Sequence, residues 1–148
     1  MEQIVKRIAA AIGAFAGLFG GWNKLMTVLA VLMALDYATG LIAAWRGKSP
    51  KTDGGGVSSK AGFDGLIRKA LIMAVVLLAT LLDTAAGNSA RVFQTAATTY
   101  YIANEGISIL ENTALMGVTY PKFVMNALEA LKQKGDGNDR DDAVSREH

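Results

Sequence analysis

Residues Leu25–Trp45, LMTVLAVLMALDYATGLIAAW, decide the fold of this chain. The stretch carries a single charge, Asp36. An α-helix needs about 20 consecutive, mostly apolar residues to cross the hydrocarbon core of a bilayer. Trp22 and Trp45 bracket the stretch. Because tryptophan is enriched at both membrane interfaces, these two side chains are candidate interfacial anchors. The sequence therefore predicts a membrane-spanning helix here.

Three further apolar segments can be recognised, at residues 8–22, 70–86 and 92–110. The first is short and rich in Ala and Gly, and the last is the most polar. At about 1.5 Å per residue, segment 70–86 reaches roughly 26 Å, which is just enough to span. We therefore expect an all-α, multi-pass membrane protein with three to four transmembrane helices that oligomerises. Segment 8–22 either spans the membrane or lies in the interface, and its length is compatible with both.

The segments between and after the apolar stretches have a different character. Residues 47–62 contain Pro50 and a run of three glycines, which predicts a flexible loop. Pro121 suits the start of a short amphipathic helix over 121–132, where apolar residues recur at helical spacing. The helical membrane domain is thus expected to cover residues 1–132. Gly, Asp, Asn and Arg dominate residues 133–148, so we expect a disordered charged tail there.

The distribution of basic residues predicts the orientation in the membrane. If all four segments span, only Lys24 and Arg91 of the 15 Lys and Arg residues lie outside. The basic 46–69 loop and the C-terminus are then cytoplasmic, in agreement with the positive-inside rule. If segment 8–22 lies flat, Lys6 and Arg7 change sides. The basic residues favour four spans.

Two acidic residues lie deep inside the apolar segments. Asp36 is 12 residues from Lys24 and 10 from Arg46, and Glu105 is 14 residues from Arg91, so both acids have a similar depth. A charge in this position costs about 3 kcal/mol on insertion scales. Neither apolar segment contains a basic residue, so we expect no salt bridge. The carboxyl groups are expected to share protons, to bond to amides and hydroxyls of a neighbouring helix, or to line water.

The last apolar segment carries a polar stripe that includes Glu105. Its residues follow one another at spacings of 3, 4, 3 and 4, which places them on one helical face: Thr98, Tyr101, Glu105, Ser108 and Asn112. In a bilayer this face needs other helices, other subunits or an aqueous lumen as its partner. Together with Asp36, these residues are our candidates for assembly or for lining a pore.

Small residues predict helix packing in two places. Gly13, Gly17 and Gly21 recur every four residues, a spacing that lets helices approach closely. Gly40 is a further candidate in the second segment. An Ala- and Gly-rich segment also produces such a row by composition alone, so the row by itself identifies no partner.

The sequence shows no motif for catalysis or for a bound group. Cysteine is absent, which excludes disulfides, thiolate metal sites and cysteine nucleophiles, and the single histidine is the last residue. There is no HExxH, phosphate-binding loop or nucleophile elbow. We predict no enzyme activity, no cofactor and no metal. The net charge of +2 and basic residues that flank apolar segments give no reason to expect nucleic acid as a partner.

Several of these motifs occur together and in order. Asp36-Tyr37-Ala38-Thr39-Gly40, Leu82-Asp83, and Asn104-Glu105 followed by Ser108–Asn112 precede Gly117 and Pro121. Over residues 22–130 this arrangement resembles the phage holin family that includes toxin-secretion holins. Thr119 stands where members of that family often have a second proline.

The resemblance implies a function in host lysis. Holins of this kind form homo-oligomeric lesions in the lipid bilayer of the bacterial cytoplasmic membrane at a programmed time. The lesions let an endolysin reach peptidoglycan without direct binding between the two proteins, and an antiholin can be a further partner. The alternatives are a small ion channel or transporter subunit that uses the buried acids, and a membrane anchor or chaperone subunit of a larger complex.

Overall fold

The computed structural model describes residues 1–137, and every regular element in that part of the chain is helical. The five α-helices are α1 (Glu2–Leu18), α2 (Lys24–Trp45), α3 (Ser59–Ala85), α4 (Val92–Leu115) and α5 (Lys122–Asp136). A short 3-10 turn, Asp53–Gly55, lies between α2 and α3. The predicted all-α class is thereby confirmed. Residues 138–148, most of the expected tail, lie outside the described residues.

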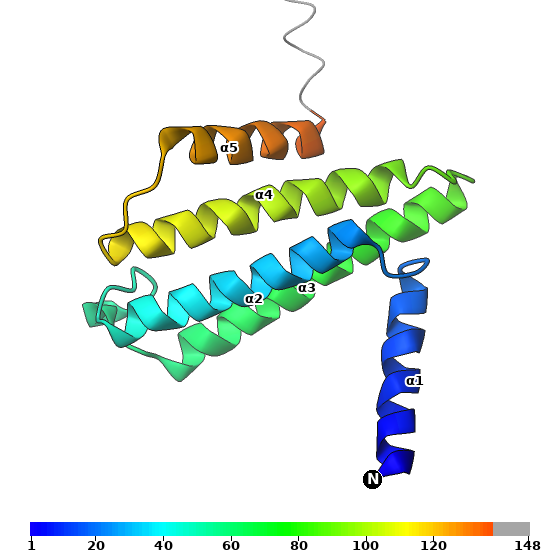
Figure 1. The fold of residues 1–148 in the computed structure, drawn as a ribbon, viewed down its shortest axis with the longest axis horizontal. Helices are drawn as coiled ribbons and strands as arrows, with labels where there is room; N and C mark the ends of the chain where they lie inside the picture. The colour runs from blue at the N-terminus through cyan, green and yellow to red at the C-terminus, as the bar shows by residue number, and fades with distance from the viewer. Residues whose placement is uncertain (138–148) are drawn as a thin grey trace, which may run out of the picture.

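Helices α2, α3 and α4 form one bundle (Figure 1). Helices α2 and α4 run in the same direction, and α3 runs antiparallel to both (Figure 1). The buried core lies toward one end of the bundle and consists of Phe19, Met26, Leu29, Met33, Ile72 and Val76. Two of the helices, α2 and α3, are long and apolar enough to cross a membrane. With 22 residues, α2 reaches about 33 Å at 1.5 Å per residue.

Helix α3 begins well before the apolar segment that predicted it. Its N-cap is Ser58, whose side chain accepts a hydrogen bond from the Ala61 amide at 3.4 Å. The helix therefore starts at Ser59 rather than at Ala70, because hydropathy marks where side chains become apolar and not where backbone hydrogen bonding begins. The connection after α2 is correspondingly shorter than the expected 47–62 loop. Most importantly, Lys69 lies inside α3.

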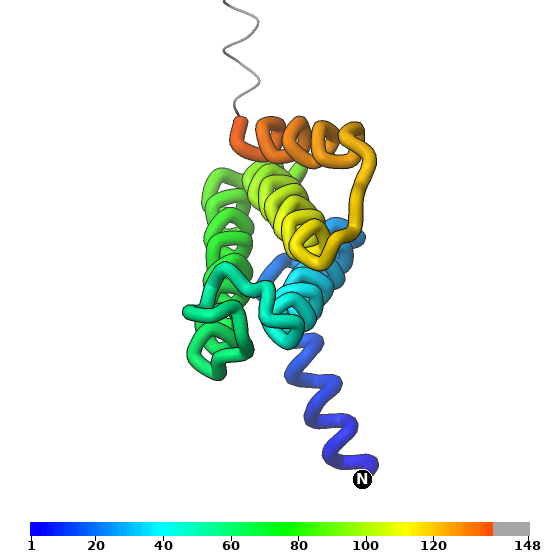
Figure 2. The backbone as a smooth tube through the Cα atoms, turned by 90° about the vertical axis from the view of Figure 1, so that its left-hand side faces the viewer, coloured from blue at the N-terminus to red at the C-terminus, as the bar shows by residue number. Residues whose placement is uncertain are grey.

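Helix α5 lies along α4, on the side away from α2 and α3 (Figures 1 and 2). Two glycines allow this close approach. A Cβ added at Gly106 would lie 2.8 Å from Leu128 Cδ2, and one at Gly135 would lie 2.5 Å from the Tyr100 nitrogen. Helix α5 ends at Asp136, beyond the expected boundary at 132. Helix α4 is thus covered on two sides by protein.

Helix α1 stands apart from the bundle and is steeply inclined to it (Figure 1). None of its residues is buried. It ends at Leu18, and Gly20 and Gly21 continue the chain with φ of 67° and 100°, a left-handed conformation that favours glycine. Gly21 therefore does not belong to a helical row with Gly13 and Gly17. A Cβ added at either of these two would meet nothing within 4 Å, so their role in packing between chains stays a prediction.

Candidate functional site

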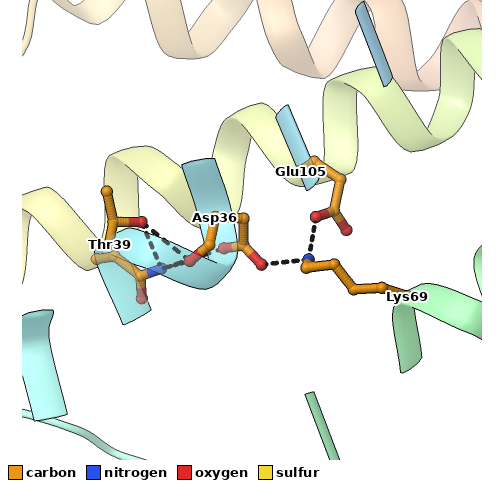
Figure 3. A network of polar contacts seen from close by, with 5 residues as sticks. Asp36, Thr39, Lys69 and Glu105 are labelled. Carbon is orange, nitrogen blue, oxygen red and sulfur yellow. Dashed lines mark hydrogen bonds and ion pairs between the residues drawn. The ribbon is translucent and has the colours of Figure 1, made fainter. Parts of the chain in front are cut away.

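Three charged side chains from three helices meet inside the bundle (Figure 3). Lys69 Nζ on α3 donates a hydrogen bond to Asp36 Oδ2 on α2 at 2.6 Å, and a second one to Glu105 Oε2 on α4. The side chains of Lys69, Asp36 and Glu105 are only 12%, 11% and 3% exposed. A single ammonium group thereby connects all three helices of the bundle. We call these three residues the charge network.

The expectation that the two acids would have no salt bridge is wrong. It rested on the absence of basic residues from the two apolar segments, and it placed Lys69 in a loop. Because α3 starts at Ser59, Lys69 lies on a helical turn that faces the other two helices. Asp36 and Glu105 do lie at one level of the bundle, since both contact the same nitrogen atom.

Asn112 extends the charge network along α4. Its side-chain Nδ2 donates to Asp36 Oδ1 at 3.1 Å, to the Asp36 main-chain oxygen at 3.3 Å and to Thr39 Oγ1 at 3.1 Å. A Cβ added at Gly40 would lie 3.6 Å from this nitrogen. Gly40 therefore lies directly at the contact between α2 and α4, where helix packing was expected.

The polar stripe of α4 faces the same chain in this structure. Thr98, Glu105 and Asn112 are buried, and Tyr101 and Ser108 are half-buried. Thr98 donates to the Gln94 oxygen one turn earlier at 2.7 Å, and Tyr101 packs against the apolar core. The partners of the buried members are thus residues of α2, α3 and α4 itself. The described residues contain no buried side-chain nitrogen or oxygen without a hydrogen bond.

A second polar network fixes the opposite end of α4. The Asp83 carboxylate accepts hydrogen bonds from the Phe93 amide at 3.0 Å, the Gln94 amide at 2.8 Å and Asn88 Nδ2 at 3.1 Å. Asp83 thus caps the N-terminus of α4, where a negative charge is favourable. The Gln94 side chain donates to Thr80 Oγ1 and to the Phe19 oxygen, both at 2.9 Å. Sequence reasoning missed Gln94, which is the third residue of the apolar segment 92–110.

Near the charge network, a small pocket of about 60 Å³ lies between α2, α3 and the loop that joins them. Asp36, Lys69 and Asn112 form part of its wall, and Lys51 and Arg68 belong to its lining as well. The charge network is therefore close to a space that is large enough for a few water molecules. In residues 1–137 no group of three or more His, Cys, Asp or Glu is placed to hold a metal ion.

The two tryptophans lie at opposite ends of α2. Trp22 is 44% exposed, and its Nε1 donates to Thr27 Oγ1 at 2.9 Å. Trp45 is the last residue of the helix and is 82% exposed. Both side chains are free to contact an interface, and their role as anchors stays a prediction.

Comparison with known proteins identifies the family. The family model described as "Bacteriophage holin family" matches residues 13–133. An uncharacterized protein of Clostridium perfringens strain 13 is 40% identical over 120 residues, which cover 81% of this chain and 84% of the relative. A protein of Bacillus phage phi105 named "Probable holin" is 34% identical over 117 residues, 78% of this chain and 80% of the relative. No solved structure matches significantly. The chain belongs to the bacteriophage holin family.

Proposed function

We propose that this protein is a holin that assembles into homo-oligomeric lesions in the bacterial cytoplasmic membrane at a programmed time. The lesions give an endolysin access to peptidoglycan, and lysis of the host follows. Membership of the holin family and the two apolar helices support this function. The protein itself performs no covalent reaction in this proposal. The basic 46–69 region and the C-terminus lie in the cytoplasm, as the positive-inside rule predicts.

The observation that carries the mechanism is the charge network. In the structure, Lys69 forms an ion pair with each of the two buried acids, and Asn112 bonds to one of them. These contacts keep the polar stripe of α4 away from lipid within a single protomer. A protomer closed in this way can accumulate in the membrane without harm. Assembly into a lesion then requires that the contacts between α4 and its neighbours rearrange, so the strength of the charge network sets the time of lysis.

Inducible expression in bacteria tests this function. Membrane potential and optical density are followed with and without an endolysin. We expect a delay, then an abrupt loss of potential, and lysis only when the endolysin is present. Asp36→Asn and Glu105→Gln should shift the time of lysis, whereas Lys51→Ala, a change at an exposed loop residue outside the charge network, should leave it unchanged. An unchanged membrane potential at high membrane abundance of the protein would contradict the proposal.

A small ion channel or transporter subunit remains the alternative from another class. It would need carboxyl groups that can exchange a proton or a cation along a path. In this structure, Lys69 occupies an oxygen of each acid. A graded, ion-selective current without abrupt collapse would favour the alternative.

A further inference from the structure

Helix α5 presents a polar stripe on the side that does not contact α4. Its five residues are all exposed and follow at spacings of 4, 3, 4 and 3, which places them on one face: Lys122, Asn126, Glu129, Gln133 and Asp136. The residues that face α4 include Leu128 and Gly135. Helix α5 is thus two-sided, with one face against protein and another that has no partner within the chain. We call these five residues the α5 stripe.

The position of α5 along the bundle decides what can surround this stripe. Leu128 on α5 meets Gly106 on α4, directly next to Glu105. Glu105 is joined through Lys69 to Asp36, which lies in the middle of α2. Helix α5 therefore lies at the level of the middle of the apolar helix α2, with α4 between the two, and not beyond the end of α2. When α2 crosses the membrane, the α5 stripe is at the depth of the hydrocarbon core. Since Gly135 meets Tyr100, α5 then ends toward the Arg91 end of α4, and this arrangement departs from the cytoplasmic C-terminus that the basic residues predict.

Hydrocarbon is a poor environment for the α5 stripe. Charged side chains at that depth are strongly disfavoured unless they face protein or a water-filled cavity. Helices α2 and α3, in contrast, expose apolar side chains that suit lipid, such as Val31, Leu71 and Leu78, which are 53%, 60% and 56% exposed. The bundle thus exposes apolar side chains on α2 and α3, whereas α5 exposes the α5 stripe next to the apolar side chains of Phe123 and Leu131, which are 72% and 39% exposed.

We propose that the α5 stripe lines an aqueous lumen that is enclosed by several copies of this chain. Helices α2 and α3 face lipid in that arrangement, and α4 is the buried spacer between them and α5. This inference rests on the proposed function, because it needs the oligomeric lesion. It also assigns the lining of the lumen to α5 and not to the polar stripe of α4, which the sequence had suggested. Thr98, Glu105 and Asn112 are buried inside the protomer, whereas the α5 stripe is free to meet water.

Because the chain has no cysteine, single introduced thiols can report on water. Asn126→Cys and Gln133→Cys probe the α5 stripe. Leu78→Cys on the exposed face of α3 is the lipid control, and Leu128→Cys probes the face of α5 that meets α4. Each protein is reconstituted into phospholipid vesicles and treated on both sides with a charged, membrane-impermeant methanethiosulfonate reagent. Leakage of an encapsulated dye is recorded in parallel.

We expect the two thiols of the α5 stripe to react on the order of tenfold or more faster than those at positions 78 and 128, because the reactive thiolate forms only in contact with water. In planar bilayers, attachment of a bulky reagent at Asn126→Cys should reduce the current through an open lesion. The same treatment should leave the current of Leu78→Cys unchanged.

The outcomes separate this inference from the proposed function. If vesicles leak and the α5 stripe reacts as slowly as position 78, the lumen is not lined by α5, and the holin function stands. If position 128 reacts as fast as position 126, α5 has left α4, and the inference is also overturned. If the unmodified protein causes no leakage of vesicles and no collapse of potential in cells, the proposed function itself fails.

Discussion

Replacing Lys69 by methionine should be one of the most damaging single changes in this protein. Methionine keeps a similar length and apolar volume but removes the ammonium group that Asp36 and Glu105 share. The two carboxyl groups, which are 11% and 3% exposed, are then left at one site without a cation. Breaking a buried ion pair by removing one partner costs about 3–5 kcal/mol.

Protonation of one of the two carboxyl groups would cost a similar amount. The protein can avoid two unpaired charges by protonating one carboxyl group. A carboxylic acid in water releases its proton near pH 4, so holding it protonated at pH 7 costs about 4 kcal/mol at roughly 1.4 kcal/mol per pH unit. We therefore expect Lys69→Met to lower the free energy of unfolding by about 4 kcal/mol, whichever route the protein takes.

A neutral version of the charge network provides the control. Combining Lys69→Met with Asp36→Asn and Glu105→Gln removes all three charges and keeps similar shapes. Replacement of a complete buried ion network is often neutral or stabilising, so this triple variant should recover most of the lost stability. The assay is denaturant unfolding of the purified protein in micelles, together with the time of lysis in cells. Equal stability of the Lys69→Met variant and the unmodified protein would refute the reasoning.

Three further changes test other contacts. Neutralising one acid, by Asp36→Asn or Glu105→Gln, should shift the time of lysis at equal membrane abundance, because each weakens the attachment of α4; unchanged timing in both variants would contradict the mechanism. Asp83→Ala removes the acceptor of three hydrogen bonds at the start of α4 and should cost about 1–3 kcal/mol of unfolding free energy, which the same denaturant titration measures. Gly106→Ala should push the Leu128 side chain of α5 out of its place on α4, because the new Cβ would lie 2.8 Å from Leu128 Cδ2. Its destabilisation, about 1–3 kcal/mol for an overpacked contact, should diminish when Leu128→Ala is added; a small effect that Leu128→Ala leaves unchanged would show that the two helices are not in contact.

Local patterns in the sequence predicted the parts of the fold that depend on neighbouring residues. The apolar run Leu25–Trp45 gave α2 to within one residue of its start at Lys24. The spacing of the α4 stripe correctly indicated a common face, of which Thr98, Glu105 and Asn112 are the buried part. Both features follow from helical periodicity, which a single segment contains completely.

The charge network could not be predicted in this way. Lys69 lies 33 residues from Asp36 and 36 from Glu105, and no periodic pattern links such distant positions. The residue also stands at the edge of an apolar segment, where hydropathy predicts a loop rather than a helix. A helix continues across such an edge because its backbone hydrogen bonds do not depend on the polarity of the side chains. The position of α5 could not be predicted from the sequence for a similar reason. Its contact with α4 depends on two glycines that only the folded chain brings to the interface.

The two polar networks together explain why α4 holds the central place in this protein. Asp83 binds one end of α4 to the end of α3, and the charge network binds its middle to α2 and α3. A helix with this many polar groups packs stably beside apolar helices only when specific polar contacts hold it there. Rearrangement of the bundle must therefore break at least one of the two networks. Since the charge network joins three helices through a single lysine, a change at this one residue can alter every contact that keeps the protomer closed.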